Sequence, residues 1–330
     1  MSSNTNPTSP LIVNLHALNL AFASPDDLLR ERFLLIYGHL PRRNGEQADI
    51  YIHWQFTSEV VAPLPHPDLP VILEDQLVSY YGDDSQLYIR LPKYGLISVD
   101  LEKGYLTGVV TSNCLTTYGV FEDVMMISLA PLYRRRKWFP LHAFAALAPN
   151  GQAALITGDM GSGKTTTGLA LLTAGWKLLS NDSPLLRIME DVVEVLAYPG
   201  QLSAFDDSLA RFTHLQKFIP AKIDETKDAL EKRVFRAEDA FVDPWATSGV
   251  VGGIFFPKVV AGLKHSELVE ISAKAAILHL MPQGVEGWDK ETIQHSLNML
   301  GTLANQSPCY VLRLSPQVEQ LPQLIHAGMI

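Results

Sequence analysis

The alternation of apolar and polar residues predicts a strand over residues 11–20, followed directly by a helix. Ser24 is expected to be the N-cap of that helix, and Pro25 suits its first position. Apolar residues then recur at the spacing of one buried helix face until Gly38 ends the pattern. Residues 1–10 are polar and show no periodicity, so we expect a flexible tail there.

Short β-rich runs alternate with turn residues between residues 49 and 111, which predicts an antiparallel meander. Residues 120–133 have a helical pattern and end in a basic cluster at residues 134–137. We interpret this cluster as a solvated helix end whose cations complement the helix dipole. Residues 11–135 are therefore predicted to form an N-terminal α+β domain.

The pattern changes near residue 139, where apolar strands begin to alternate with helical segments, as is typical of an α/β sheet domain. We expect residues 136–330 to form this second domain. Its central strand is predicted over residues 250–260, where two adjacent glycines permit a close backbone approach. Further elements are expected as helices at 272–282 and 290–304 and as a last strand at 311–314.

A glycine-rich turn between a strand and a helix is the most specific motif of the chain. Residues 153–175 read AALITGDMGSGKTTTGLALLTAG, and they contain the pattern G-x-x-x-x-G-K-[ST] of a Walker A loop, or P-loop. Glycines allow the backbone N–H groups of such a loop to point inward at one anion. The sequence therefore predicts a nucleotide triphosphate site, with binding residues Gly158, Asp159, Gly161, Ser162, Gly163, Lys164, Thr165 and Thr166.

Two residues are candidates to hold Mg²⁺ at this site. The hydroxyl of Thr165 is the expected ligand within the loop motif, and Lys164 would reach the β- and γ-phosphates. Residues 176–181 read as the next strand, whose end would bring Asp182 close to the loop. Mg²⁺ takes only one or two protein carboxylates beside water and phosphate oxygens, so Asp182 alone is sufficient.

Composition and charge narrow the classes of partner. The chain has 330 residues, 47% hydrophobic and 18% charged, with a net charge of −9 and no apolar run of about 18 residues. We therefore expect no nucleic-acid partner and no membrane partner, and any bound phosphate must be held locally. Cys114 and Cys309 fit neither a disulfide framework nor a zinc spacing, and the N-terminus lacks the order of a signal peptide. These features predict a cytoplasmic protein.

The segments FPLHAFAAL and GDMGSGKTTTGLALLTAGWKLLSND resemble the C-terminal catalytic domain of HPr kinase/phosphorylase and the broader group of phosphoenolpyruvate-carboxykinase-like P-loop proteins. The resemblance spans roughly residues 139–190. It includes His142, sixteen residues before Gly158, the Gly158-Asp159 opening of the loop and the Gly175-Trp176 start of the next strand. It implies an HPr kinase-like P-loop fold for the second domain, with homo-oligomers suggested by the relatives.

The resemblance also implies an ATP-dependent kinase that uses Mg²⁺ and transfers phosphate to a hydroxyl acceptor, a protein or peptide serine or a small alcohol. Lys164, Asp182 and His142 would then be the catalytic residues. The family has two aspartates at the end of the strand, of which the first is the base, whereas this chain has Asn181 and then Asp182. A serine-glutamate pair of the family is Thr165-Thr166 here, and the family's motif for its protein partner is not visible.

Because an amide cannot act as a base, a second hypothesis is an ATP-binding regulatory or scaffold protein, or an NTPase, that transfers no phosphate. The mixed-charge segment 203–240 offers two further candidates in either case. Arg233 and Arg236 are three residues apart, on one face of a possible helix, and either could bring a cation to the γ-phosphate.

Overall fold

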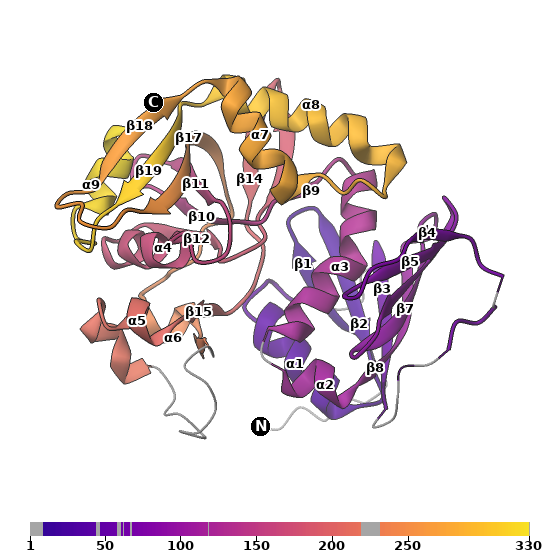
Figure 1. Ribbon diagram of the computed structural model, residues 1–330. Coiled ribbons are helices and arrows are strands. Elements are labelled where there is room, and N and C mark those ends of the chain that lie inside the picture. Colours follow the sequence, from indigo (N-terminus) through magenta and orange to yellow (C-terminus); the bar gives the residue numbers. More distant parts are fainter. Residues whose placement is uncertain are drawn as a thin grey trace. The chain divides into compact units, whose positions relative to one another are not determined.

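The computed structural model shows a mixed α/β protein (Figure 1) and describes residues 9–43, 47–57, 61, 63–66, 68–117, 119–218 and 232–329. Residues 1–8 of the expected tail lie outside these described residues. The chain forms two compact units, which we call unit 1 (residues 1–136) and unit 2 (residues 137–330).

The described part of unit 1 contains an eight-stranded sheet with the strand order β1-β2-β3-β8-β7-β6-β5-β4. The strands from β4 to β8 pair with one another in antiparallel fashion, which confirms the predicted meander for that stretch. The elements of unit 1 are β1 Leu11–Leu15, β2 Leu18–Ala23, α1 Asp27–Tyr37, β3 Ile50–Thr57, β4 Val71–Leu73, β5 Ser79–Gly82, β6 Gln86–Leu91, β7 Gly95–Asp100, β8 Tyr105–Thr111, α2 Ser112–Thr116 and α3 Val120–Arg135.

The prediction that residues 49–57 belong to the meander is wrong. This segment is β3, which lies parallel to β2 on one side and parallel to β8 on the other. The helix α1 connects β2 to β3, and a helical crossover returns the chain to the sheet in its original direction. A tight hairpin would have given an antiparallel pair.

The start of α1 also differs from the prediction. The helix begins at Asp27 with Asp26 as its N-cap residue, so Pro25 precedes the helix. The Ser24 hydroxyl oxygen accepts a hydrogen bond from the Asp26 amide (3.1 Å), which makes a local turn. The Asp26 carboxylate accepts one from the Phe56 amide of β3 (2.8 Å). A tertiary bond to the sheet has therefore shifted the helix start by two residues.

Two arginines of the predicted basic cluster interact with the end of their own helix, as expected. The Nη1 atom of Arg135 donates to the carbonyl of Pro131 (3.1 Å), and that of Arg136 donates to the carbonyl of Leu132 (3.2 Å). These guanidinium groups thus bond carbonyls of the last turns of α3, where cations complement the helix dipole.

Unit 2 is built on a second sheet with the order β12-β10-β11-β17-β14-β13-β9, and β19 pairs with both β17 and β18. The long strand β17 pairs with β14 near its start and with β19 toward its end. The elements of unit 2 are β9 Phe139–Pro140, β10 Ala143–Leu147, β11 Gln152–Thr157, α4 Lys164–Thr173, β12 Lys177–Ser180, β13 Leu185–Met189, β14 Val192–Leu196, β15 Leu202–Ala204, α5 Asp206–Leu209, the 3₁₀ helix η1 Thr213–Phe218, β16 Arg233–Phe235, α6 Ala237–Ala240, β17 Ser248–Val259, β18 Glu267–Ile271, α7 Ala273–Gly284, α8 Lys290–Gln306, β19 Cys309–Leu314 and α9 Leu321–Ala327.

The predicted central strand, the two long helices and the last strand are confirmed as β17, α7, α8 and β19. Gly252 and Gly253 lie in β17, where a Cβ atom would come within 2.9 Å of the Gln152 and Phe255 side chains respectively. The two glycines therefore make room for side chains, and the expected close approach of another backbone is not among their nearest contacts. The segment 203–240 is not the expected helical stretch: its described parts are short helices and the two strands β15 and β16, and residues 219–231 lie outside the described residues.

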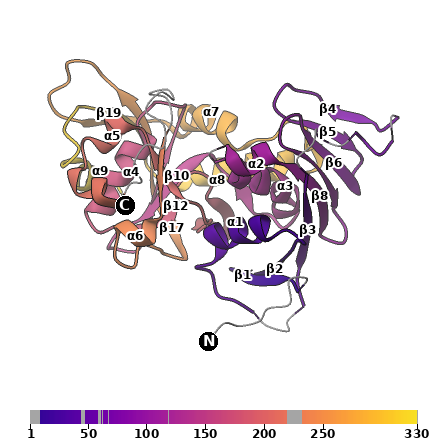
Figure 2. The same cartoon turned by 90° about the horizontal axis from the view of Figure 1, so that it is seen from below.

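Helices cover both faces of the unit 2 sheet. On one face α4 and α9 pack in a buried cluster that also contains Leu202 of β15 and Leu209 of α5. On the other face α7 and α8 contribute Leu280, Met299 and Leu303 to a second buried cluster. Figures 1 and 2 show the sheet between these two sets of helices. The unit is thus a three-layer arrangement in which the sheet is shielded on both sides.

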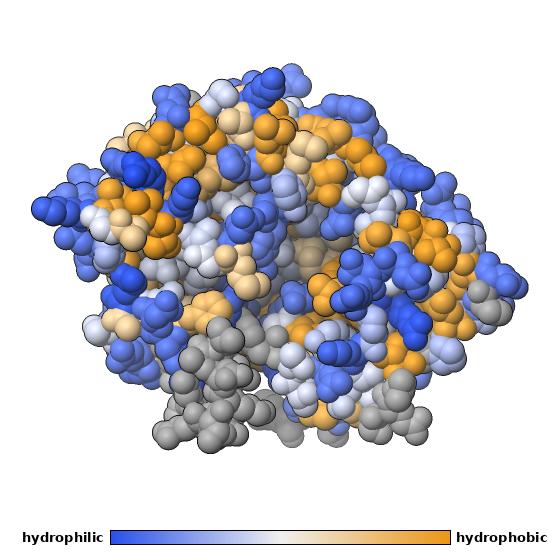
Figure 3. Space-filling model, in the orientation of Figure 1, coloured by the Kyte–Doolittle hydropathy of each residue, from blue (hydrophilic) through white to orange (hydrophobic). Residues whose placement is uncertain are grey.

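The outer side of α7 carries exposed apolar residues. Leu278 and Met281 are exposed, whereas Ala276 and Leu280 of the same helix are buried. Figure 3 shows apolar side chains interspersed with hydrophilic ones on the face that carries α7. Among the described residues, every helix is too short or too polar to cross a membrane.

Two glycines of unit 2 helices provide a matched test of the packing. A Cβ atom on Gly168 of α4 would lie 2.4 Å from the ring of buried Phe144 in β10, whereas one on Gly301 of α8 would meet nothing within 4 Å. We predict that Gly168→Ala lowers the free energy of unfolding by about 1–3 kcal/mol. Gly301→Ala should raise it by about 0.5–1 kcal/mol, because alanine favours the helix. Urea denaturation of both variants measures the two changes, and equal effects would contradict the tight contact between α4 and β10.

Candidate functional site

The glycine-rich turn between β11 and α4, which we call the glycine loop (residues 158–163), has a backbone that requires glycine at three positions. Gly158, Gly161 and Gly163 have φ angles of 147°, 78° and 109°. Side-chain-bearing residues rarely adopt these angles, so the glycines are needed for the path of the chain. The Ser162 amide donates to the Asp159 carbonyl (3.2 Å), which closes a turn within the loop.

Two residues from neighbouring strands pack under the glycine loop. A Cβ atom on Gly163 would come within 2.4 Å of the Leu314 side chain of β19, and Pro257 of β17 lies 3.9 Å away. The hydroxyl oxygen of Ser162 is buried and has no hydrogen-bond partner among the described residues. A buried hydroxyl without a partner is costly, so this oxygen is available to a group that enters the loop.

The Lys164 ammonium group lies within the glycine loop. It donates to the carbonyl oxygens of Gly158 (2.5 Å) and Asp159 (3.2 Å). Burial lowers the pKa of Lys164, the positive charge of Lys232 lowers it further, and the carboxylates of Asp182 and Asp159 oppose this shift. Lys164 is also the first residue of α4, so its charge and the positive end of the helix dipole act at one place.

The sheet brings the two other predicted catalytic residues to the same edge. The strands β11 and β17 are parallel, and β12 runs the same way because β10 is antiparallel to both β11 and β12. The glycine loop follows β11, Asp182 follows β12 and His142 precedes β10, so all three lie at the carboxyl edge of the parallel strands. Ligands of α/β sheets bind at this edge.

Backbone hydrogen bonds fix the position of His142 from three directions. Its amide donates to the Gln283 carbonyl of α7 (2.8 Å), and its carbonyl accepts a bond from the Thr157 hydroxyl of β11 (2.8 Å). The amide of the next residue, Ala143, donates to the Asp182 carbonyl (2.9 Å). The ends of β11, β12 and α7 therefore meet at residue 142.

The side chains of His142 and Asp182 form a pair. The Nδ1 atom of His142 lies 3.4 Å from Oδ1 of Asp182, and the two side chains are 44% and 51% exposed. A carboxylate at this distance favours the proton on Nδ1, which leaves Nε2 as the proton acceptor of the ring. The pair is thus accessible to a group that approaches the sheet edge.

Asn181 makes a structural contact. Its side-chain nitrogen donates to the carbonyl of Gln201 (3.1 Å), and its side-chain oxygen is buried without a hydrogen-bond partner among the described residues. The amide therefore links the end of β12 to the segment that leads into β15.

The oxygen atoms of Thr165 and Asp182 are of the kind that Mg²⁺ prefers as ligands. Thr165 lies in the first turn of α4 with a half-buried side chain, and the acidic side chain of Asp182 is half exposed. No group of three or more His, Cys, Asp or Glu side chains that could hold a metal occurs in the described part of the chain. Mg²⁺ needs no such group, because water and phosphate oxygens complete its shell. The Thr166 hydroxyl instead donates to Ser208 of α5 (2.9 Å).

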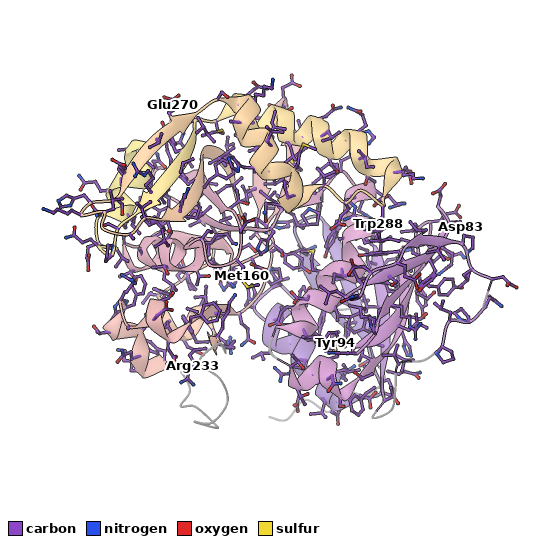
Figure 4. The ribbon with its side chains drawn as sticks, in the orientation of Figure 1. Asp83, Tyr94, Met160, Arg233, Glu270 and Trp288 are labelled. Carbon is purple, nitrogen blue, oxygen red and sulfur yellow. The ribbon has the colours of Figure 1, made fainter. Side chains whose placement is uncertain are left out.

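The prediction that Arg233 and Arg236 share a helix face is wrong. Arg233 lies in β16, and Arg236 is the N-cap residue of α6, because the segment pairs with β15 in a two-stranded sheet. Their guanidinium groups bind carboxylates: Arg233 contacts Asp206 (2.9 Å) and Arg236 lies 3.7 Å from Glu238. Figure 4 labels Arg233 among the elements β15, α5 and α6, on the side of α4 away from the sheet.

Sequence reasoning missed three residues near the glycine loop. Lys232 acts electrostatically on Lys164, and Gln283 of α7 donates from its side chain to the Asp159 carboxylate (3.4 Å). Met160, labelled in Figure 4, is 85% exposed at the tip of the loop. The two polar residues are distant from the motif along the chain, so only the tertiary structure reveals them. An unusually apolar residue within the motif was the one available signal for Met160.

Comparison with known proteins assigns no family to the chain. No protein-family model matches it, and no curated protein matches it. Among solved structures, the HPr(Ser) kinase/phosphatase from Coxiella burnetii is similar, with 13% sequence identity and a TM-score of 0.32. The match covers 57% of this chain and 94% of that protein. A likeness at this TM-score carries no argument about function, so a functional proposal must rest on the geometry of the site.

Proposed function

We propose that the protein is an ATP-dependent phosphotransferase, a kinase, that moves the γ-phosphoryl group of Mg·ATP to a hydroxyl acceptor. The acceptor class is a serine of a protein or peptide, or a small alcohol. The preference for ATP and the hydroxyl acceptor class follow the sequence resemblance to HPr kinase/phosphorylase, and the polyphosphate site and the roles of the residues rest on the geometry of the site.

The observation that carries the proposal is the meeting of three groups at one sheet edge. The Lys164 ammonium lies within the glycine loop, and the His142–Asp182 pair stands at the ends of neighbouring strands. The negative charge of Asp182 reaches Lys164 strongly enough to affect its pKa. The proposed polyphosphate site would therefore adjoin a pair of groups that can accept a proton.

Phosphoryl transfer requires positioning and charge neutralisation more than covalent help. The amides of the glycine loop and Lys164 would hold the β- and γ-phosphates. The hydroxyl proton of the acceptor would pass to Nε2 of His142, while Asp182 holds the ring through Nδ1. The acceptor oxygen bonds to the γ-phosphorus as the bond from that phosphorus to the bridging oxygen breaks, and ADP leaves with the electron pair.

Thr165 and Asp182 would hold Mg²⁺ together with the phosphate oxygens. When bound, the ion neutralises negative charge on the β- and γ-phosphates. Asp182 can serve both the metal and His142, because its carboxylate has two oxygens and Oδ1 is the one that lies 3.4 Å from Nδ1.

A second function is favoured by one observation at Asn181. The resemblance places a catalytic aspartate at this position, yet the amide here is bonded to the Gln201 carbonyl. A protein that binds ATP and transfers nothing, or one that only hydrolyses it, would keep the loop and lose the base. The two functions differ in whether His142 takes over proton transfer.

Lys164 gives the first test, which holds for both functions. We predict that Lys164→Ala weakens ATP binding by at least about a hundredfold, because the loop loses its buried positive charge. The matched control is Lys177→Ala, since Lys177 is an exposed lysine at the start of β12, paired with Asp243. Titration calorimetry in magnesium buffer measures both variants. Equal affinities for the two would contradict a phosphate site in the glycine loop.

His142 separates transfer from binding. With γ-labelled ATP and a cell extract as the source of acceptors, we expect the wild-type protein to label an acceptor. We predict that His142→Gln retains ATP affinity within about threefold but loses label transfer by a factor of about 10²–10⁴, the usual contribution of a general base. Release of free phosphate alone by the wild type would support the hydrolase, and tight binding without turnover would support the regulatory protein.

Asn181 tests the structural role of the amide. We predict that Asn181→Asp lowers the free energy of unfolding by about 1–3 kcal/mol, because a carboxylate cannot donate to the Gln201 carbonyl and is left buried there. Thermal unfolding at neutral pH measures this loss. If the variant is instead as stable as the wild type and transfers phosphate faster, the site is a degenerate form of the two-aspartate arrangement, and His142 is not the base.

A further inference from the structure

Lys232 occupies a defined place at one end of the small sheet β15–β16. Ala204 pairs with Arg233 in this sheet, so Phe205, which follows β15, and Lys232, which precedes β16, leave it at the same end. The Lys232 ammonium lies over the Phe205 ring, 5.6 Å from its centroid. Within the described residues this cation therefore has an aromatic face as its neighbour, where the next two cations along the chain have carboxylates.

This end of the small sheet is joined to the start of α4. Phe205 is the N-cap residue of α5, and Ser208 of that helix accepts the hydrogen bond from the Thr166 hydroxyl in the first turn of α4. Residues of β15 and α5 also share a buried cluster with α4. The end of the small sheet that carries Lys232 is thus connected, through α5, to the first turn of α4, the helix that begins at Lys164.

The charge of Lys232 reaches the glycine loop. Burial has the largest effect on the pKa of Lys164 and lowers it; Asp182 raises it next, then Lys232 lowers it, and Asp159 raises it least. Two ammonium groups that repel each other are a source of free energy for binding an anion, because a phosphate between them relieves the repulsion. Arg233 and Arg236 are already paired with carboxylates and cannot act in this way without losing those contacts.

We propose that Lys232 is a second phosphate-binding residue, which contacts the terminal phosphoryl group of a bound nucleoside triphosphate and so distinguishes triphosphate from diphosphate. The Lys164 ammonium bonds carbonyls of the glycine loop, whereas the Lys232 ammonium lies over the Phe205 ring and would reach the terminal phosphoryl group from there. A phosphate oxygen is a stronger partner for an ammonium group than an aromatic ring. This inference rests on the proposed function, because it presupposes a nucleotide in the glycine loop.

The test compares ATP with ADP. Titration calorimetry of the whole chain in magnesium buffer, for the wild type and for Lys232→Met, gives four affinities. We expect the substitution to weaken ATP binding about tenfold, the loss of one charge-assisted contact, and to leave ADP affinity within about twofold. Lys232→Arg, which keeps the positive charge, should recover most of the ATP affinity.

A matched control exists in the same segment of the chain. The ammonium group of Lys217 lies over the ring of the adjacent Phe218, 4.7 Å from its centroid, at the end of η1. Lys217→Met thus removes a lysine with the same kind of neighbour and the same charge. It should change neither the ATP nor the ADP affinity, and circular dichroism of all variants checks that each is folded.

The outcomes separate this inference from the proposed function. If the wild type binds ATP, and Lys232→Met binds ATP and ADP as the wild type does or loses both equally, the inference is overturned while the nucleotide site stands. A loss of ATP affinity in Lys217→Met as large as in Lys232→Met would also overturn it, because the effect would be one of net charge. If the wild type binds neither nucleotide, the proposed function falls, and the inference with it.

Discussion

The site depends on one constraint, the need to provide hydrogen-bond acceptors for a half-buried ammonium group. Lys164 meets it with the carbonyls of Gly158 and Asp159, which are available only because the loop follows left-handed backbone angles. The same path starts α4 at the lysine, where the positive end of the helix dipole lies. The glycines, the helix start and the lysine are thus one unit, and the strands β17 and β19 support it through Pro257 and Leu314.

Local sequence patterns were sufficient to predict an element wherever the residues within that element determine its structure. The spacing of glycine, lysine and threonine predicted the turn between β11 and α4, and apolar runs predicted β17, α7, α8 and β19. The same patterns gave a wrong prediction where contacts with a segment distant in the sequence determine the direction or the start of an element. The direction of β3 depends on the crossover through α1, and the start of α1 depends on a bond from Asp26 to β3. Neither partner can be read from the residues of the element itself.

The same distinction separates the predicted from the missed parts of the site. Asp182 was a candidate through its place after a predicted strand and His142 through the resemblance, and the sheet order explains how strand ends far apart in sequence bring them together. Arg233 and Arg236 were candidates to bring a cation to the γ-phosphate because a helical spacing was assumed. Residues 233–235 instead pair with β15 as a strand, and both guanidinium groups lie beside carboxylates. Lys232, one residue earlier, had no motif of its own, and only its neighbours in space distinguish it.

The hydrogen bonds that hold the main chain of residue 142 limit which parts of the site can vary in sequence. Its main chain is tied to the ends of β11, β12 and α7, while almost half of its imidazole surface is open to solvent. The imidazole ring can turn about the two rotatable bonds of the side chain. The main chain of residue 142, however, cannot shift without breaking hydrogen bonds to three elements at once. A molecule that binds at this edge therefore meets an imidazole group whose point of attachment is fixed. Selectivity among such molecules must arise from the exposed surroundings, such as the tip of the loop at Met160, which can change without disturbing the frame.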